Sequence, residues 1–198
     1  MSATESSSSP HAITLKVALL EQEVGKTSLM VRYVESRWDE AYSSTLGINF
    51  MEKTVALKNA QCTFIIFDLG GAKSFSSMLP LVLTDAVAVF FMFDLTRKET
   101  LKGVKNWFKQ ARIFNKSAIP FLVGTKFDTF VQLSQEDQLD IQETAKKYAR
   151  AMGAPLVFCS SYASINVQKL FKLVLAKAFN LECTIPQMHD LGQPILEY

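Results

Sequence analysis

The chain has little of several features that would define a protein class at once. Its 198 residues include three cysteines, two histidines and eight glycines. An odd number of widely spaced cysteines favours reduced thiols in a cytosolic protein over a disulfide framework or a zinc site. No apolar run reaches the length of a membrane span, and the longest, 86–93, has the length of a buried strand.

Charge of one sign is also not in excess. There are 21 lysines and arginines against 19 aspartates and glutamates, and the net charge of +2 argues against strong binding to nucleic acid.

Residues 1–12 are rich in serine and lack a hydrophobic signal region, which predicts a disordered tail. The C-terminal residues Ile195 to Tyr198 include no cysteine for prenylation, so no direct membrane anchor is expected.

Strand-like and helix-like segments alternate through the rest of the chain. This alternation predicts an α/β fold with a mostly parallel, six-stranded sheet flanked by about five helices. We expect one domain over residues 13–182 and an unlipidated extension over 183–198. The expected strands are 15–20, 48–57, 62–67, 86–94, 120–124 and 156–160, and the expected helices are 25–34, 98–114, 134–152 and 167–179.

The first candidate motif lies between the first strand and the first helix. Gly25, Lys26 and Thr27 open the helix, as in a phosphate-binding P-loop, where backbone N–H groups face the anion. In that motif the lysine reaches the terminal phosphates and the threonine hydroxyl binds Mg²⁺. The full pattern also requires a glycine five residues before Gly25, and Leu20 occupies that place.

Three more polar motifs follow expected strands. Asp68 and Gly71 suit a Mg²⁺-bound water and a terminal phosphate. Asp128 can accept two N–H bonds from the edge of guanine, which adenine cannot supply, and the stem of Lys126 can lie along the base. The remaining candidates are the loop Ser160-Ser161-Tyr162, beside the guanine carbonyl, and Thr45, before the second expected strand.

In this order, the motifs resemble those of the Ras-superfamily small GTPases, which have a P-loop NTPase G-domain. More narrowly, the chain is similar to the fungal septation-initiation and mitotic-exit GTPases, over about 13–198. The stretches that carry the resemblance are 25–31, 45–50, 68–71, 93–97, 123–126, 164–169 and 194–198.

The resemblance implies GTP or GDP and Mg²⁺ as ligands. Lys26 would contact the β- and γ-phosphates, Thr27 and Thr45 would bind Mg²⁺, and Asp68 would hold the ion through water. Gly71 would donate its N–H to the γ-phosphate, and Trp38 would pack against guanine. The nucleotide-binding set is Val24, Gly25, Lys26, Thr27, Ser28, Trp38, Thr45, Gly71, Thr125, Lys126, Asp128, Ser160, Ser161 and Tyr162.

The resemblance also implies a cellular setting. It implies a cytoplasmic monomer that reaches spindle poles through protein partners. In its GTP form it would recruit an effector protein kinase, under control of a two-part GAP and an exchange factor. Switch I would be about 38–47 and switch II about 70–78.

The sequence departs from the family in four places. Either Leu20 replaces the leading glycine, or the loop is one residue short and the strand ends at Leu20. Glu21 and Glu23 add carboxylates beside a phosphate site, each costing about 1–4 kcal/mol if it points at the phosphates and little if it points outward. Ala72 replaces the glutamine that orients the attacking water, so no catalytic residue is assigned. Tyr162 stands where a small residue is expected.

Three functions remain open from the sequence. The chain is a slow nucleotide-dependent switch, a pseudo-GTPase that binds partners with little or no nucleotide, or another P-loop enzyme such as an ATPase or kinase. The guanine-binding pattern of Thr125, Lys126 and Asp128 disfavours the last. We favour the switch, because a pseudo-GTPase would be free to lose Lys26, Thr27, Thr45 and Asp128, and all four are present.

Overall fold

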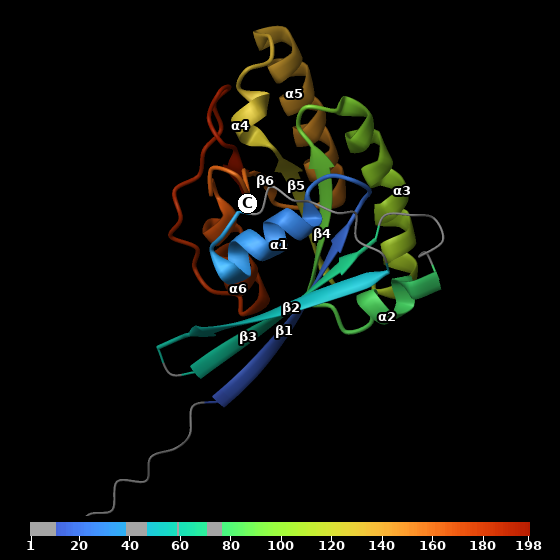
Figure 1. Cartoon of the computed structure of the whole chain (residues 1–198), viewed down its shortest axis with the longest axis vertical. Coiled ribbons are helices and arrows are strands. Elements are labelled where there is room, and N and C mark those ends of the chain that lie inside the picture. The colour runs from blue at the N-terminus through green and yellow to red at the C-terminus, as the bar shows by residue number, and fades with distance from the viewer. Residues whose placement is uncertain (1–10, 39–46, 59, 71–76) are drawn as a thin grey trace, which may run out of the picture.

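A single twisted sheet with helices on both faces organises the chain (Figure 1). The computed structural model describes residues 11–38, 47–58, 60–70 and 77–198. Within these ranges the sheet has seven strands in the order β2-β3-β1-β4-β5-β6-β7. The strands are β1 (His11–Leu20), β2 (Ile48–Ala56), β3 (Ala60–Leu69), β4 (Ala88–Asp94), β5 (Ile119–Thr125), β6 (Leu156–Phe158) and β7 (Leu196–Glu197).

The predicted α/β class is confirmed, and the sheet has one strand more than expected. Strands β3, β1, β4, β5 and β6 are parallel, whereas β2 and β7 pair antiparallel at the two edges. The additional strand is β7, which comes from the C-terminal extension and is only two residues long. The first strand also begins at His11, two residues before the domain boundary expected from composition.

Six helices within the described ranges cover the sheet, one more than the number expected. Helices α1 and α6 pack on one face, and α2, α3 and α5 pack on the other (Figure 1). They are α1 (Lys26–Glu35), α2 (Leu79–Leu83), α3 (Lys98–Phe114), α4 (Phe127–Phe130), α5 (Gln135–Met152) and α6 (Val167–Ala178).

Local sequence signals explain where several of these elements begin and end. The hydroxyl of Ser134 accepts a hydrogen bond from the backbone N–H of Asp137, which caps α5 as the sequence predicts. Gly153 ends that helix with a φ of 61°, a left-handed conformation that glycine adopts without steric cost. All seven residues of β4 are buried, because helices cover both faces of this central strand.

The C-terminal extension is held against the domain. Ile195 and Leu196 are fully buried, and Ile195 accepts a backbone hydrogen bond from Phe158 in β6 at 2.8 Å. The amide of Asn166 donates to the carbonyls of both Phe158 and Pro194. The extension therefore completes one edge of the sheet. Within the described ranges, no helix is long and apolar enough to cross a membrane.

Candidate nucleotide-binding site

The loop between β1 and α1 is short. Strand β1 continues to Leu20, which is buried in the core, so the loop spans residues 21–25. Glu21, Glu23 and Gly25 have positive φ values of 114°, 49° and 83°. They alternate with Gln22 and Val24, and such alternation of φ is typical of backbone turns whose N–H groups bind an anion. The loop thus keeps the general form of an anion site with one residue fewer.

Glu21 occupies a conformation that a glycine would adopt at less cost. A φ of 114° in a residue with a side chain costs about 1–3 kcal/mol. The carboxylate is buried and lies against Gly103 of α3. The contact is so close that a Cβ added to this glycine would be 2.8 Å from the Oε2 atom of Glu21. Burial raises the pKa of Glu21, and a hydrogen bond from the Gln22 N–H partly opposes this. Glu21 is therefore packed inward, whereas Glu23 is exposed.

Lys26, Thr27 and Asp68 meet where α1 begins and β3 ends. The Lys26 ammonium donates to the Glu21 carbonyl at 2.6 Å and lies 3.6 Å from the Asp68 carboxylate. The Thr27 hydroxyl donates to the other oxygen of Asp68. Burial lowers the pKa of Lys26, and the Asp68 and Glu21 carboxylates act in the opposite direction.

This arrangement fits a Mg²⁺ ion held with a nucleotide. A hydroxyl and a carboxylate are oxygen ligands of the kind Mg²⁺ prefers, and Mg²⁺ usually binds proteins through one or two such groups with substrate phosphates and waters. Within the described ranges there is no group of three or more histidine, cysteine, aspartate or glutamate side chains that could form an all-protein metal site. Among the described residues, Thr27 would therefore bind the ion and Asp68 would hold it through water.

The end of β5 brings the base-binding candidates to the phosphate loop. The Thr125 hydroxyl donates to the Val24 carbonyl at 2.7 Å. Lys126, with a φ of 61°, is the N-cap residue just before α4, and its ammonium lies 2.7 Å from the Asp94 carboxylate. The Asp128 carboxylate accepts hydrogen bonds from the hydroxyls of Ser160 and Thr129. A carboxylate has about four lone-pair sites, so Asp128 can still accept two N–H bonds from a base.

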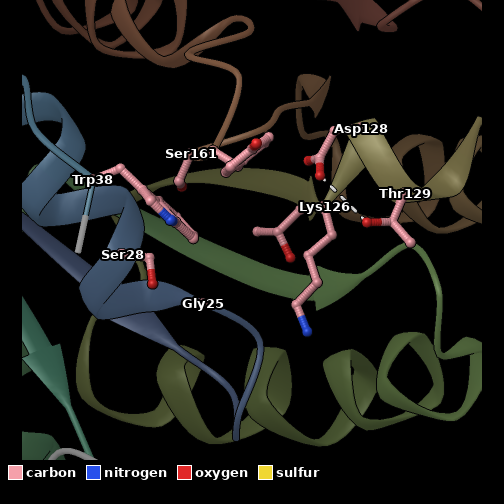
Figure 2. A pocket seen from close by; sticks show the side chains of 9 residues that line it. Gly25, Ser28, Trp38, Lys126, Asp128, Thr129 and Ser161 are labelled. Atoms are coloured by element: carbon pink, nitrogen blue, oxygen red, sulfur yellow. Dashed lines mark hydrogen bonds between the residues drawn. The ribbon is translucent and has the colours of Figure 1, made fainter. Parts of the chain in front are cut away.

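Thr125, Lys126, Asp128 and Thr129 line one pocket of about 310 Å³. Figure 2 shows Trp38 and Ser28 on one side of it and Lys126, Asp128 and Thr129 on the other. The rings of Trp38 and Tyr162 meet edge to face with centroids 5.6 Å apart, so Tyr162 joins the aromatic side of the pocket. Its lining is Gly25, Ser28, Trp38, Thr125, Lys126, Asp128, Thr129, Ser161 and Tyr162.

Two arginines hold these loops and were not assigned from the sequence. The Arg97 guanidinium donates hydrogen bonds to the Asp94 carboxylate and the Glu23 carbonyl. These bonds connect the end of β4 to the phosphate loop. Arg32 on α1 donates to the Ser161 carbonyl at 2.6 Å and the Tyr162 carbonyl at 3.0 Å. No local pattern marks the role of Arg32, since both of these partners are more than 100 residues away in sequence.

Asp94 is the centre of this network. It is fully buried, and burial would raise its pKa. Hydrogen bonds from Lys126, Thr96 and Arg97 outweigh that effect and hold the pKa of Asp94 below its ordinary value. A buried carboxylate bound to two cations stays charged and fixes both of their side chains.

Three of the residues assigned from the sequence lie outside the described ranges: Thr45, Gly71 and Ala72. The segments that would form the switches nevertheless meet where they are described. The Gly70 N–H donates to the Gly47 carbonyl at 2.7 Å, joining the end of β3 to the start of β2.

Comparison with known sequences identifies the family. A sequence model of the Ras family matches residues 16–180. The chain belongs to the Ras family. Septum-promoting GTP-binding protein 1 of Schizosaccharomyces pombe is 56% identical to it over 187 residues, which is 94% of each chain. Ras-related protein Rab-31 of Rattus norvegicus is 32% identical over 160 residues, 80% of each chain. Ras-related protein Rab-22A of Canis lupus familiaris is 33% identical over 160 residues, 79% of each.

Membership in the Ras family makes the chain a switch of the small GTPase type. Ras-family GTPases bind GTP and GDP, typically with Mg²⁺, and work with effectors, GAPs and exchange factors in general. The pocket reaches Gly25 at the N-terminus of α1, and Thr27 and Asp68 are hydrogen-bonded to each other beside the same helix end.

Proposed function

We propose that the chain binds GDP and GTP and selects guanine through Asp128. One observation carries this proposal: Ser160 and Thr129 hold the Asp128 carboxylate in position at a pocket that extends to Gly25. A carboxylate fixed in this way loses little freedom when it accepts the guanine N–H donors. Adenine offers no such pair of donors, so ATP would leave the carboxylate unmatched.

We further propose that this switch acts in septation. The support is the 56% identity to a relative named a septum-promoting GTP-binding protein. By resemblance to the fungal septation GTPases, the GTP form would recruit a protein kinase at spindle poles, and a two-part GAP would end the signal. An apolar surface next to the switches supports partner binding, because the ring of Phe50 is 55% exposed and stacks on Phe67 with centroids 5.7 Å apart.

Slow hydrolysis is part of the same proposal. Ala72 offers a methyl group where the family carries the glutamine that orients water, and a methyl group cannot form a hydrogen bond. Bound GTP would then persist and prolong the signalling state.

A second candidate function is that of a pseudo-GTPase. The Lys26 ammonium is engaged by the carbonyl of Glu21 within its own loop, and Glu21 holds a costly backbone conformation. A triphosphate would have to replace this intraloop contact. If that exchange is unfavourable, the protein binds its partners without nucleotide.

Nucleotide content and base preference together separate the two candidates. Heat release and chromatography of the purified full chain should yield GDP or GTP close to one per protein. A competition titration should then show GTP bound at least about 100-fold more tightly than ATP, since two charge-assisted hydrogen bonds distinguish the bases. Asp128→Ala should abolish this preference, whereas Asp190→Ala, at an exposed carboxylate in the C-terminal extension, should leave it unchanged. Equal affinity for ATP and GTP would overturn the proposal, and protein free of nucleotide with no measurable GTP binding would favour the pseudo-GTPase.

A further inference from the structure

Helices α3 and α5 leave an apolar groove between them, away from the nucleotide pocket. Its volume is about 500 Å³, and it shares no lining residue with the pocket of Asp128. The rings of Phe108 and Tyr148 and the side chain of Met152 contribute its apolar lining, and all three pack against the hydrophobic core. The complete lining is Lys105, Phe108, Lys109, Lys147, Tyr148, Ala151 and Met152.

Every charged residue that lines the groove is a lysine. Lys105, Lys109 and Lys147 are exposed, and no carboxylate lines the groove with them. Three like charges are a large local excess in a chain whose net charge is +2. The positive charge is therefore concentrated around an apolar surface.

Two other lysines on the same helices are paired. Lys98 on α3 bonds Asp140 on α5, and Lys146 on α5 lies 2.8 Å from Glu197. Among the described residues, no such pairing holds Lys105, Lys109 or Lys147. Their ammonium groups remain available to carboxylates of another molecule.

We propose that this groove binds an acidic segment of a partner protein, and that one large apolar side chain of the segment enters it. The apolar lining supplies hydrophobic contact, and the three lysines select carboxylates on either side of the inserted residue. A concave site with an apolar interior suits an inserted side chain better than the flat headgroup surface of a membrane. The surface around Phe50 is made of other residues, so the groove would be a second contact region, separate from the switch face.

Peptide selection on the full-length protein tests the proposal. The chain is immobilised through an N-terminal tag and panned against a displayed library of random 12-residue peptides. We expect the recovered peptides to carry several aspartates or glutamates around one leucine, methionine or aromatic residue. Recovered peptides without excess acidic residues would overturn the proposal.

Matched variants then locate the binding site by fluorescence anisotropy with a labelled recovered peptide. Lys105→Glu with Lys147→Glu should weaken binding at least about tenfold, because two attractive contacts become repulsive. The control, Lys58→Glu with Lys172→Glu, makes the same change in net charge at exposed lysines that do not line the groove. Equal losses in both double variants would show a non-specific charge effect and would overturn the proposal.

A third variant separates the groove from its rim. Ala151 is exposed and lines the groove, so Ala151→Trp should fill it without changing charge or the buried core. We expect the peptide to bind at least about fivefold more weakly. Unchanged binding would mean that the lysines act without the groove, which contradicts insertion.

Vesicles provide the competing outcome. Vesicles of phosphatidylcholine with about 30% phosphatidylserine should neither sediment the protein nor displace the peptide at physiological salt. Suppose that the parent co-sediments with the vesicles, that the Lys105→Glu and Lys147→Glu double variant does not, and that the vesicles displace the peptide. The groove would then bind a membrane surface, and the proposal of a protein segment would be overturned.

Discussion

The hydroxyl of Thr125 donates a hydrogen bond of 2.7 Å to the carbonyl of Val24, across 101 residues of sequence. Both groups are buried, so this bond fixes the loop that carries Asp128 against the loop that carries Lys26. The same hydroxyl also lies 3.1 Å from the Phe93 carbonyl, which ties in the end of β4. Base and phosphate recognition are thus parts of one packed unit.

Thr125→Val should weaken nucleotide binding while keeping the volume of the side chain. Loss of the hydroxyl leaves a buried carbonyl without this donor, at a cost of about 1–3 kcal/mol. This cost destabilises the conformation that binds nucleotide, so we expect the Kd for GDP to rise about tenfold. Displacement of a fluorescent GDP measures the Kd. Thr54→Val is the matched control, since Thr54 is exposed and, among the described residues, its hydroxyl forms a hydrogen bond only with the hydroxyl of Thr63. If Thr54→Val raises the Kd for GDP as much as Thr125→Val does, the bond from Thr125 to Val24 has no specific role in nucleotide binding.

Glu21→Gln should change how stability depends on pH. Burial raises the pKa of Glu21 above its ordinary value of 4.5, so the folded protein retains this proton where the unfolded chain has lost it. The contribution of Glu21 to stability is therefore largest below about pH 4.5 and declines as pH rises through the raised pKa. We expect the free energy of unfolding of Glu21→Gln, minus that of the parent, to increase from acidic to neutral pH and then level off.

Urea titrations at several pH values measure this difference. Glu23→Gln changes an exposed carboxylate of the same loop and serves as the control. A difference for Glu21→Gln that stays constant with pH would contradict a raised pKa in the folded state.

Restoring the phosphate loop should favour triphosphates. Replacing Leu20-Glu21 by Leu-Gly-Asp adds one residue and supplies a glycine, which adopts positive φ without steric cost. The affinity for GTP should rise more than the affinity for guanosine, because the altered loop faces the phosphates and the base site is unchanged. Isothermal titration with both ligands measures the two affinities.

The control for this repair is Leu-Ala-Asp, which restores the loop length without the glycine. A smaller gain with alanine would assign the defect to backbone conformation, and an equal gain would assign it to length. If neither repair improves GTP binding, the loop does not limit affinity.

Ala72→Gln should raise single-turnover hydrolysis. The added amide can orient the attacking water, and we expect phosphate release from preloaded protein to increase about tenfold or more, most clearly with a GAP. Ala72→Asn carries the same amide on a shorter side chain and should give a smaller gain. A parent that already hydrolyses GTP as fast as Ala72→Gln would show that another residue positions the water.

Much of the fold could be predicted from the sequence because its signals are local. The apolar run of β4 and the Ser134 cap of α5 depend on neighbouring residues, and the structure has both. The strand β7 could not be predicted in the same way, because Leu196 and Glu197 form a strand only by pairing with β6. A two-residue segment has no periodicity of its own.

For the candidate site, the sequence by itself determined which groups are present: a lysine and a threonine at a helix start, one carboxylate near the end of β3 and one after β5. Spacing along the chain was enough, since parallel strands deliver their carboxyl ends to one edge of the sheet. Only the tertiary structure decided what holds these groups. It placed Arg32 on the carbonyls of Ser161 and Tyr162, and it buried Glu21 against α3. Contacts between segments so far apart in sequence arise from packing, and no local pattern encodes them.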